Sequence, residues 1–252
     1  MQSVGDGSVD DGSVDDGSAA FAAARGRLFG IAYRMLGTVA DAEDVVQDSW
    51  LRWQRTDRDE VREPPAFLAT VATRLAINAA TSAHARRTSY IGPWLPEPVD
   101  TSADPTIGAE RGEAVSLAVL LLLERLTPTE RAAYILRVAF DYSHREVAEV
   151  LQTTEVNARQ LTARARGHLA GERRQPVRRD EQEKLLRAFL AAAQAGNLGA
   201  LEAVLTEDAV SYSDGGGVVS AARKPVVGRD RVAAFLVGVA AKFGQRIDVV
   251  FG

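Results

Sequence analysis

The segment Thr127–Leu169 constrains the fold most, because it contains start signals for three short helices in close succession. Thr127 is a suitable N-cap for the first helix, and Ser143–Glu146 reads as a capping box that begins the second. A tight turn at Gln152-Thr153 follows, and Thr154 can cap a third, longer helix. The spacing therefore predicts helix, short helix, turn and longer helix within one small unit.

The third of these helices has one apolar and one polar face. Its apolar positions form a single stripe made of Ala158, Leu161, Ala165 and Leu169. Arg can pair with a guanine edge or a phosphate, and Asn or Gln with adenine, so the remaining side chains are candidates for DNA contacts: Asn157, Arg159, Gln160, Arg164 and Arg166. A helix-turn-helix is predicted. The alternative is an ordinary αα-hairpin. The turn of a helix-turn-helix often carries Gly, whereas Gln152 stands there.

The formal net charge of −4 argues against nucleic acid only until it is resolved along the chain. Residues 1–20 contain five Asp and no basic residue, and residues 91–110 contain four acidic residues and no basic one. Residues 156–179 hold seven Arg and one acidic residue. A clustered Arg run is expected where a protein binds phosphates, although a solvated helix face gives the same pattern.

Composition excludes several classes of protein. The chain has no Cys and three scattered His, which excludes a disulfide scaffold and a Cys/His metal site. The acidic, Gly- and Ser-rich start lacks the basic and apolar segments of a secretory signal. The longest apolar run, Leu117–Leu123, is far shorter than the ~20 residues that a membrane span needs. We expect a cytoplasmic protein with no cofactor.

The predicted fold class is mainly α, with two small all-helical domains and a partial α+β domain. Residues 1–20 are expected to form a disordered acidic tail, 21–90 a first helical domain and 91–112 a Pro-rich linker. Residues 113–172 form the second helical domain, and 183–252 an incomplete α+β unit that includes strand-like Ala209–Tyr212 and Ile247–Phe251. In the first domain, helices are expected from Phe21, from near Asp41 and after Pro64.

Two separate segments resemble one known family, in the family's order. TPTERAAYILR, HREVAEVL and ARQLTARAR resemble region four of an extracytoplasmic-function sigma factor, which reads the minus-35 promoter element. LFGIAYRMLGTVADAEDVVQDSWLRW resembles the early part of region two, which docks on the clamp helices of the RNA polymerase β′ subunit. PPAFLATVATRLAIN followed by HARR resembles the later part, which holds the minus-10 element as single strand.

The resemblance implies a promoter-specificity factor that is not an enzyme. Its implied partners are core RNA polymerase, through the β′ clamp helices and the β flap, and promoter DNA; an anti-sigma protein stays open. The implied polymerase contacts are acidic and aromatic: Asp41, Glu43, Asp44, Asp48, Trp50 and Trp53. At least one of the two Trp side chains is better explained as core.

The candidates for minus-10 contacts are Arg62, Phe67, Arg74, Asn78, Arg86 and Arg87, of which Phe67 is as well explained by packing.

Two further motifs resemble a subgroup of the family with a SnoaL-like C-terminal extension, the SigJ type. They are WLPEP in the linker and YSDGGGVVSAARKPVVGRDRV near the end. The resemblance implies a cone-shaped domain whose glycine turn faces the linker and takes part in regulation, through Trp94, Leu95, Pro96, Glu97, Pro98, Asp214, Gly215, Gly216 and Gly217. The subgroup typically has Lys after the third Gly, whereas Val218 stands there.

Two alternative functions remain at this stage. The SnoaL-like unit could be a small-molecule sensor or an enzyme fused to a DNA-binding regulator, although residues 169–252 contain no His and no Cys. A simple helix-turn-helix repressor is the other alternative, and it leaves the acidic first domain unexplained.

Overall fold

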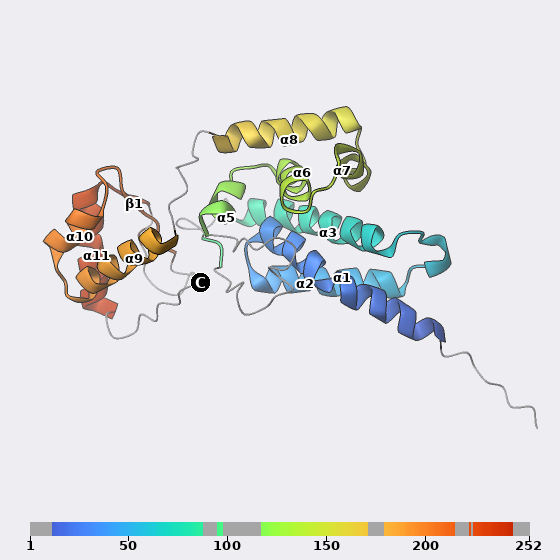
Figure 1. Ribbon diagram of the computed structural model, residues 1–252, viewed down its shortest axis with the longest axis horizontal. Helices are drawn as coiled ribbons and strands as arrows, with labels where there is room; N and C mark the ends of the chain where they lie inside the picture. Colours follow the sequence, from blue (N-terminus) through green and yellow to red (C-terminus); the bar gives the residue numbers. More distant parts are fainter. Residues whose placement is uncertain are drawn as a thin grey trace, which may run out of the picture. The chain divides into compact units, whose positions relative to one another are not determined.

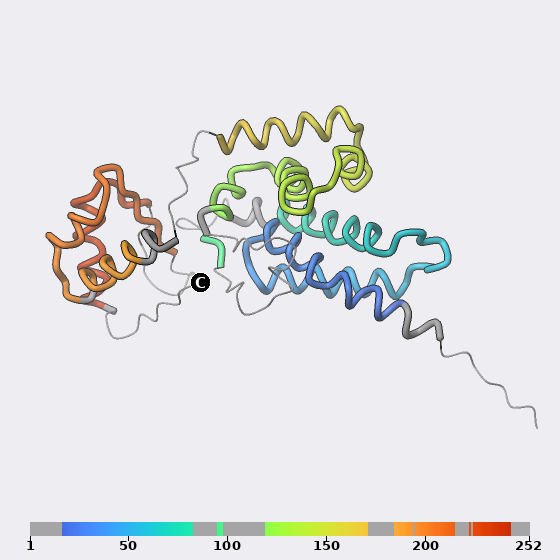
Figure 2. The backbone as a smooth tube through the Cα atoms, in the orientation of Figure 1, coloured from blue at the N-terminus to red at the C-terminus, as the bar shows by residue number. Residues whose placement is uncertain are grey.

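The computed structural model describes residues 12–87, 95–97, 117–170, 179–214, 222 and 224–243 (Figure 1). Figure 2 traces the backbone in the same orientation as a tube. These residues belong to two compact units. One unit contains both helical modules of the first two thirds of the chain. The other contains the C-terminal helices and strands, together with Leu95.

The first module comprises α1 (Gly12–Leu36), α2 (Val39–Gln54), a 3-10 turn (Arg58–Glu60) and α3 (Pro64–Arg87). Gly37, with a φ of 79°, ends α1, a conformation that glycine adopts without steric cost. Thr38 then caps α2 by accepting a hydrogen bond from the Asp41 backbone N–H. Pro64 opens α3, where its missing N–H is not needed. The three expected helices are confirmed (Figure 1).

The second module comprises α5 (Leu117–Leu123), α6 (Pro128–Ala139), α7 (His144–Leu151) and α8 (Glu155–Ala170). Thr127 with Glu130 and Ser143 with Glu146 each form a complete capping box at the starts of α6 and α7. The side chain of Thr154 accepts a hydrogen bond from the Asn157 backbone N–H at the start of α8. The predicted succession of helices around a tight turn is therefore confirmed.

The C-terminal unit has the expected α+β character in its described residues. It comprises α9 (Arg179–Gln194), α10 (Leu198–Val204), β1 (Val210–Ser211), β2 (Val226–Val227) and α11 (Arg229–Phe243). The two strands pair antiparallel, with Val210 opposite Val227. A small apolar cluster that includes the buried side chains of Ala192, Leu201 and Ala233 holds the helices together. The strand expected at Ile247–Phe251 lies outside the described residues.

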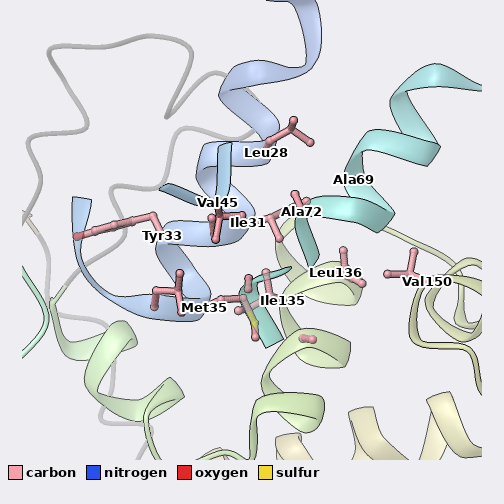
Figure 3. Packing of buried hydrophobic residues seen from close by; sticks show 14 of the residues in the cluster. Leu28, Ile31, Tyr33, Met35, Val45, Ala69, Ala72, Ile135, Leu136 and Val150 are labelled. Carbon is pink, nitrogen blue, oxygen red and sulfur yellow. The ribbon is translucent and has the colours of Figure 1, made fainter. Parts of the chain in front are cut away.

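The two helical modules share one hydrophobic core. Figure 3 shows side chains of α1, α2, α3, α6 and α7 in a single cluster, including Ile31, Ala72 and Leu136. Leu28, Ile31 and Met35 of α1 are completely buried. Burial of each such side chain stabilises the fold by about 1.5–3 kcal/mol. The sequence predicted the separate helices of each module, but not that they pack together.

The expectation of a disordered tail at residues 1–20 is wrong for residues 12–20, which belong to α1. The physical reason lies in Trp53, whose indole N–H donates a hydrogen bond of 2.8 Å to the Gly17 carbonyl. A buried indole needs such a partner. Residues 1–11 lie outside the described residues. Within the part of the chain that is described, no helix is long and apolar enough to cross a membrane.

The tight turn between α7 and α8 forms although it carries no glycine. Gln152 adopts the left-handed conformation, with φ 52° and ψ 50°. Its backbone N–H donates to the carbonyls of the last turn of α7, as a C-terminal cap requires. A side chain in this conformation costs roughly 1–2 kcal/mol, because Cβ lies too close to a carbonyl oxygen.

We expect Gln152→Gly to raise the free energy of unfolding by about 0.5–1 kcal/mol, because glycine removes this steric cost and loses part of the gain to its larger entropy when unfolded. Urea unfolding followed by circular dichroism measures the change. Gln160→Gly is the matched control in the interior of α8 and should lower stability by up to about 1 kcal/mol. Loss of stability in both variants would contradict the interpretation of the turn.

Candidate functional site

The helix-turn-helix presents the polar face of α8 outward. Ala158, Leu161, Ala165 and Leu169 are buried, as the apolar stripe predicted. Of the five predicted DNA contacts on this helix, four are exposed and Asn157 is half-buried; the exposed ones are Arg159, Gln160, Arg164 and Arg166. The structure therefore brings the predicted minus-35 set onto one helix in the second module.

Local partners already hold three of these side chains. The Asn157 amide donates to the Thr153 hydroxyl at 2.8 Å, and Arg159 donates to Glu155 at 2.9 Å in an exposed i,i+4 pair. Exposed pairs of this kind stabilise a protein by at most about 1 kcal/mol, so Arg159 can exchange Glu155 for a base at little cost. Arg164 Nε donates to Glu130 Oε1 at 2.9 Å, and that carboxylate is buried.

Glu130 is the carboxylate on which α6 and α8 converge. Its side chain is only 7% exposed, and it accepts hydrogen bonds from Arg164 and from the Thr127 hydroxyl at 2.8 Å. Burial acts to raise the pKa of Glu130, but the hydrogen bonds from Arg164 and Thr127 outweigh it and lower the pKa below its ordinary value. Glu130 is therefore ionised at neutral pH and needs Arg164 as its counter-charge.

The predicted minus-10 residues divide between surface and interior. Arg62 and Asn78 are exposed, whereas Phe67 is half-buried with its ring centroid 5.8 Å from that of Trp53. Arg74 donates to the carbonyls of Val150 at 3.0 Å and Glu149 at 3.4 Å. In this arrangement Arg74 thus contacts the end of α7. Arg86 and Arg87 belong to α3, but their side chains lie outside the described residues.

The predicted polymerase face on α2 is mostly accessible, with one correction. Asp44 and Asp48 are exposed, Asp41 accepts a hydrogen bond of 2.7 Å from the cap residue Thr38, and Glu43 forms a two-oxygen pair with Arg25. Trp53 is only 2% exposed, so the prediction that its side chain contacts the polymerase is wrong for this conformation. Its indole is part of the core.

Trp50, by contrast, reaches the surface. It is half-buried, and its ring lies 4.9 Å from that of Phe21. Both rings line an open groove of about 510 Å³ between α1 and α2, with Val46 at its apolar wall and the Arg25–Glu43 ion pair among its lining residues. Such a groove can receive an apolar side chain of a partner helix whose basic groups meet the acidic residues of α2.

The linker residues Pro96 and Glu97 lie against the first module. The Glu97 backbone N–H donates to the Gly37 carbonyl at 2.7 Å, and the Tyr33 hydroxyl donates to the Glu97 carbonyl. The Glu97 carboxylate accepts a hydrogen bond of 3.0 Å from Val39, the first residue of α2. A carboxylate at this position also complements the positive end of the helix dipole.

Leu95 contacts the C-terminal unit, as the resemblance implied. Its backbone N–H donates to Asp214 Oδ2 at 3.0 Å. Trp94, Pro98 and the glycines Gly215, Gly216 and Gly217 lie outside the described residues. The structure thus supplies one direct contact between the linker motif and the residue that begins the glycine turn.

Sequence reasoning missed the arginines that lie between the two modules. Arg131 is 5% exposed and donates to the Met35 carbonyl and to Glu124. Arg27 lies over the rings of Phe140 and Tyr142. The sequence does contain a signal for Arg131. Glu130 and Arg131 are charged residues among the otherwise apolar buried positions of α6, which indicates that both have partners inside the protein.

Comparison with known proteins agrees with both modules. Residues 20–87 match the family model "Sigma-70 region 2", and residues 116–169 match "Sigma-70, region 4". The chain is 39% identical over 232 residues to the "ECF RNA polymerase sigma factor SigJ" of Mycobacterium tuberculosis, an alignment that covers 89% of this chain and 73% of the relative. It is 32% identical over 220 residues to the "Probable ECF RNA polymerase sigma factor SigI" of the same species, covering 85% and 73%.

A solved structure is also similar. The crystal structure of the Mycobacterium tuberculosis extracytoplasmic function sigma factor SigJ aligns with a TM-score of 0.72 and 36% sequence identity. The alignment covers 90% of this chain and 76% of that chain.

The buried Glu130 makes stability depend on pH. Its pKa is lowered in the folded state, so the stabilisation is present above the unfolded value of about 4.5 and is lost as the pH falls through the folded value. Glu130→Gln should cost about 1.5–3 kcal/mol at pH 7, the typical contribution of a hydrogen bond to a charged group. The same variant should lose less stability than the wild type as the pH falls below about 4.5.

Urea unfolding at a series of pH values measures both effects. The matched control is Glu155→Gln, which removes an exposed carboxylate and should cost less than about 1 kcal/mol at any pH. An acid response of Glu130→Gln that equals that of the wild type would show that Glu130 does not contribute to the pH dependence.

Proposed function

The chain belongs to the extracytoplasmic-function group of the sigma-70 family of RNA polymerase sigma factors, and from this premise we propose which of its residues carry out each step. The protein directs RNA polymerase to specific promoters and initiates transcription there. It is not an enzyme; its partners are core RNA polymerase and promoter DNA. The observation that supports this function best is the helix-turn-helix within the residues that match region 4, whose last helix has an arginine-rich exposed face.

We propose that α8 reads the minus-35 element in the major groove. Arg159 and Gln160 lie in the first half of α8 and are exposed, as base-reading side chains of a recognition helix must be. Arg166 lies further along the helix, where recognition helices meet phosphates. Arg164 is held by Glu130, so its main role is to fix the angle between α6 and α8.

The surface of α3 and the turn before it are proposed to hold the opened minus-10 strand. Arg62 and Asn78 support this, because both are exposed and neither is explained by packing. The aromatic ring of Phe67 is half-buried beside Trp53, so only its exposed part can stack on a base. Arg86 and Arg87 stay in the proposal as backbone contacts from the end of α3.

Docking on the polymerase is assigned to α2 and the groove beside it. Asp44 and Asp48 present carboxylates to a basic partner helix, and Trp50 with Phe21 offers an apolar anchor point. We propose the β′ clamp helices as the partner of this face and the β flap as the partner of the second module. The protein is proposed to act in the cytoplasm, where its polymerase partner works.

The C-terminal unit is proposed to modulate this activity through the linker. The hydrogen bond from Leu95 to Asp214 supports a direct contact of the WLPEP segment with the unit. A small-molecule sensor in the same unit remains the alternative, and it would make the effect of the unit depend on an added ligand.

In vitro transcription with core polymerase on a randomised promoter pool tests the function and the role of Arg159. The wild type should select promoters with defined minus-35 and minus-10 elements. Arg159→Ala should relax the preference at one minus-35 base pair by about 1–3 kcal/mol, the usual value of a bidentate base contact. Arg166→Ala should weaken binding to all promoters and reduce the salt slope by about one.

The results separate the whole function from the single residue. Absence of any selected promoter with active core enzyme would contradict the function itself. Normal selection with an unchanged base profile in Arg159→Ala would remove only Arg159 from the base-reading set.

We expect Asp214→Ala to change promoter-dependent transcription in the same direction as deletion of the residues after 180, because both remove the acceptor of the Leu95 N–H. The effect should be a fraction of that of the deletion. Asp230→Ala is the control, since its exposed carboxylate pairs with Arg229 in the same unit. Equal transcription by the wild type, the deletion and Asp214→Ala would show that the C-terminal unit is inert in this assay.

A further inference from the structure

One large apolar side chain lies open on the helix that is proposed to read DNA. Val156 of α8 is 67% exposed, the highest fraction among the large exposed apolar side chains in the described residues. Isolated exposed valines are common on protein surfaces, so this fraction alone indicates nothing. The position of Val156 on α8 and the groups around it are what point to a role.

Val156 lies opposite the side of α8 that packs on the protein. At 3.6 residues per turn, Ala158 and Ala165 lie about 200° and about 180° around the helix from Val156, and both are completely buried. Helices α6 and α7 contact α8 and lie on one side of it (Figure 1). The valine is therefore at the middle of the outer face of α8.

The side chains around Val156 on this face include the proposed base readers. Arg159, Gln160 and Ala163 follow Val156 at spacings of three, four and seven residues, so the four residues share one face, and all are exposed. Val156 is also the second residue of α8, and the N-terminal residues of a recognition helix contact base edges. Its position is therefore that of a base-reading residue.

The neighbours of Val156 along the chain have partners elsewhere and leave it uncovered. The Asn157 amide donates to the Thr153 hydroxyl at 2.8 Å, and the Glu155 carboxylate accepts from Arg159 at 2.9 Å. Valine is also a poorer helix former than alanine or leucine, because its branched Cβ restricts the side chain. Neither packing nor helix propensity therefore accounts for a valine at this position.

An apolar side chain can recognise one feature of the major groove. The base edges there present hydrogen-bond donors and acceptors, and thymine also presents its C5 methyl group. Valine has no side-chain donor or acceptor, so against a polar base edge it would displace water without replacing the lost hydrogen bonds. Contact with a thymine methyl group instead buries apolar surface on both partners.

We propose that Val156 is a further specificity-determining residue of the minus-35 contact, and that it selects one thymine through the C5 methyl group of that base. The inference rests on the proposed function, because it takes α8 to be the helix in the major groove. Val156 then specifies one T·A pair, while Arg159 and Gln160 form hydrogen bonds with neighbouring pairs. The DNA contacts predicted on α8 from the sequence were all hydrogen-bond donors, which is why Val156 was not among them.

Replacement of thymidine by deoxyuridine tests the contact, because it removes only the C5 methyl group from the major groove. The probes are fragments of a promoter that the wild type selects, each with one minus-35 thymine replaced on one strand. Binding of the full chain assembled with core polymerase is measured by competition with the unmodified fragment. The wild type should bind one of these fragments about fourfold more weakly, the factor that corresponds to burial of about one methylene group.

Val156→Ala should bind the unmodified promoter about fourfold more weakly than the wild type, and it should no longer distinguish thymidine from deoxyuridine at that position. Alanine is the better helix former, so the variant should stay folded, which urea unfolding checks. Val227→Ala in β2 is the matched control. It makes the same change at a valine that is 55% exposed in the C-terminal unit, and it should keep the fourfold preference.

The outcomes separate the residue from the whole function. A wild type that tolerates deoxyuridine at every minus-35 thymine would overturn the role of Val156, as would a Val156→Ala variant that keeps the fourfold preference. A selected minus-35 element made only of G·C pairs would overturn it as well. All three results leave the sigma function intact. Absence of any selected promoter with active core enzyme would contradict the proposed function, and the role of Val156 with it.

Discussion

The C-terminal half of α1 must be enclosed on all sides, and the arrangement of the first unit depends on this constraint. Within residues 28–36, LFGIAYRML, the side chains of Leu28, Phe29, Ile31, Tyr33, Met35 and Leu36 are all buried. A helix that is apolar around its circumference cannot lie on the surface of a single small bundle. Helix α2 covers only part of this apolar surface, and α6 of the second module covers more of it. Burial of apolar surface therefore stabilises the packing of the second module on the first.

Much of the local structure could be predicted from the sequence, because its signals are short-range. Capping residues at Thr127 and Ser143 and the glycine at position 37 act within a few residues of where they stand. The role of an arginine depends instead on what lies opposite it in space. Arg74 was predicted as a minus-10 contact because it is a basic residue in the segment that resembles the later part of region two, yet the carbonyls it contacts belong to residues more than 70 positions away.

The same limit explains the mixed result for α8. The 3.6-residue period predicted which face of α8 is exposed, but it did not predict how strongly each arginine on that face is bound by other groups of the protein. Arg159 has an exposed carboxylate one turn away, whereas Arg164 neutralises a buried one on another helix. Removal of Arg164 would leave a buried charge without its partner, which is far more costly than loss of a surface pair. The two arginines look alike in the sequence, but Arg159 can leave its exposed partner and bind DNA, whereas Arg164 must keep its ion pair with the buried Glu130.

The prolines of the linker motif limit which of its backbone N–H groups can form hydrogen bonds. Proline has no backbone N–H, so in the stretch Leu95-Pro-Glu-Pro98 only Leu95 and Glu97 can donate. Both donors have partners, the Asp214 carboxylate and the Gly37 carbonyl respectively. Gly37 is itself the residue that ends α1, and the Glu97 side chain accepts from the first N–H of α2. Within the described part of this segment, both backbone N–H groups are therefore hydrogen-bonded to the protein.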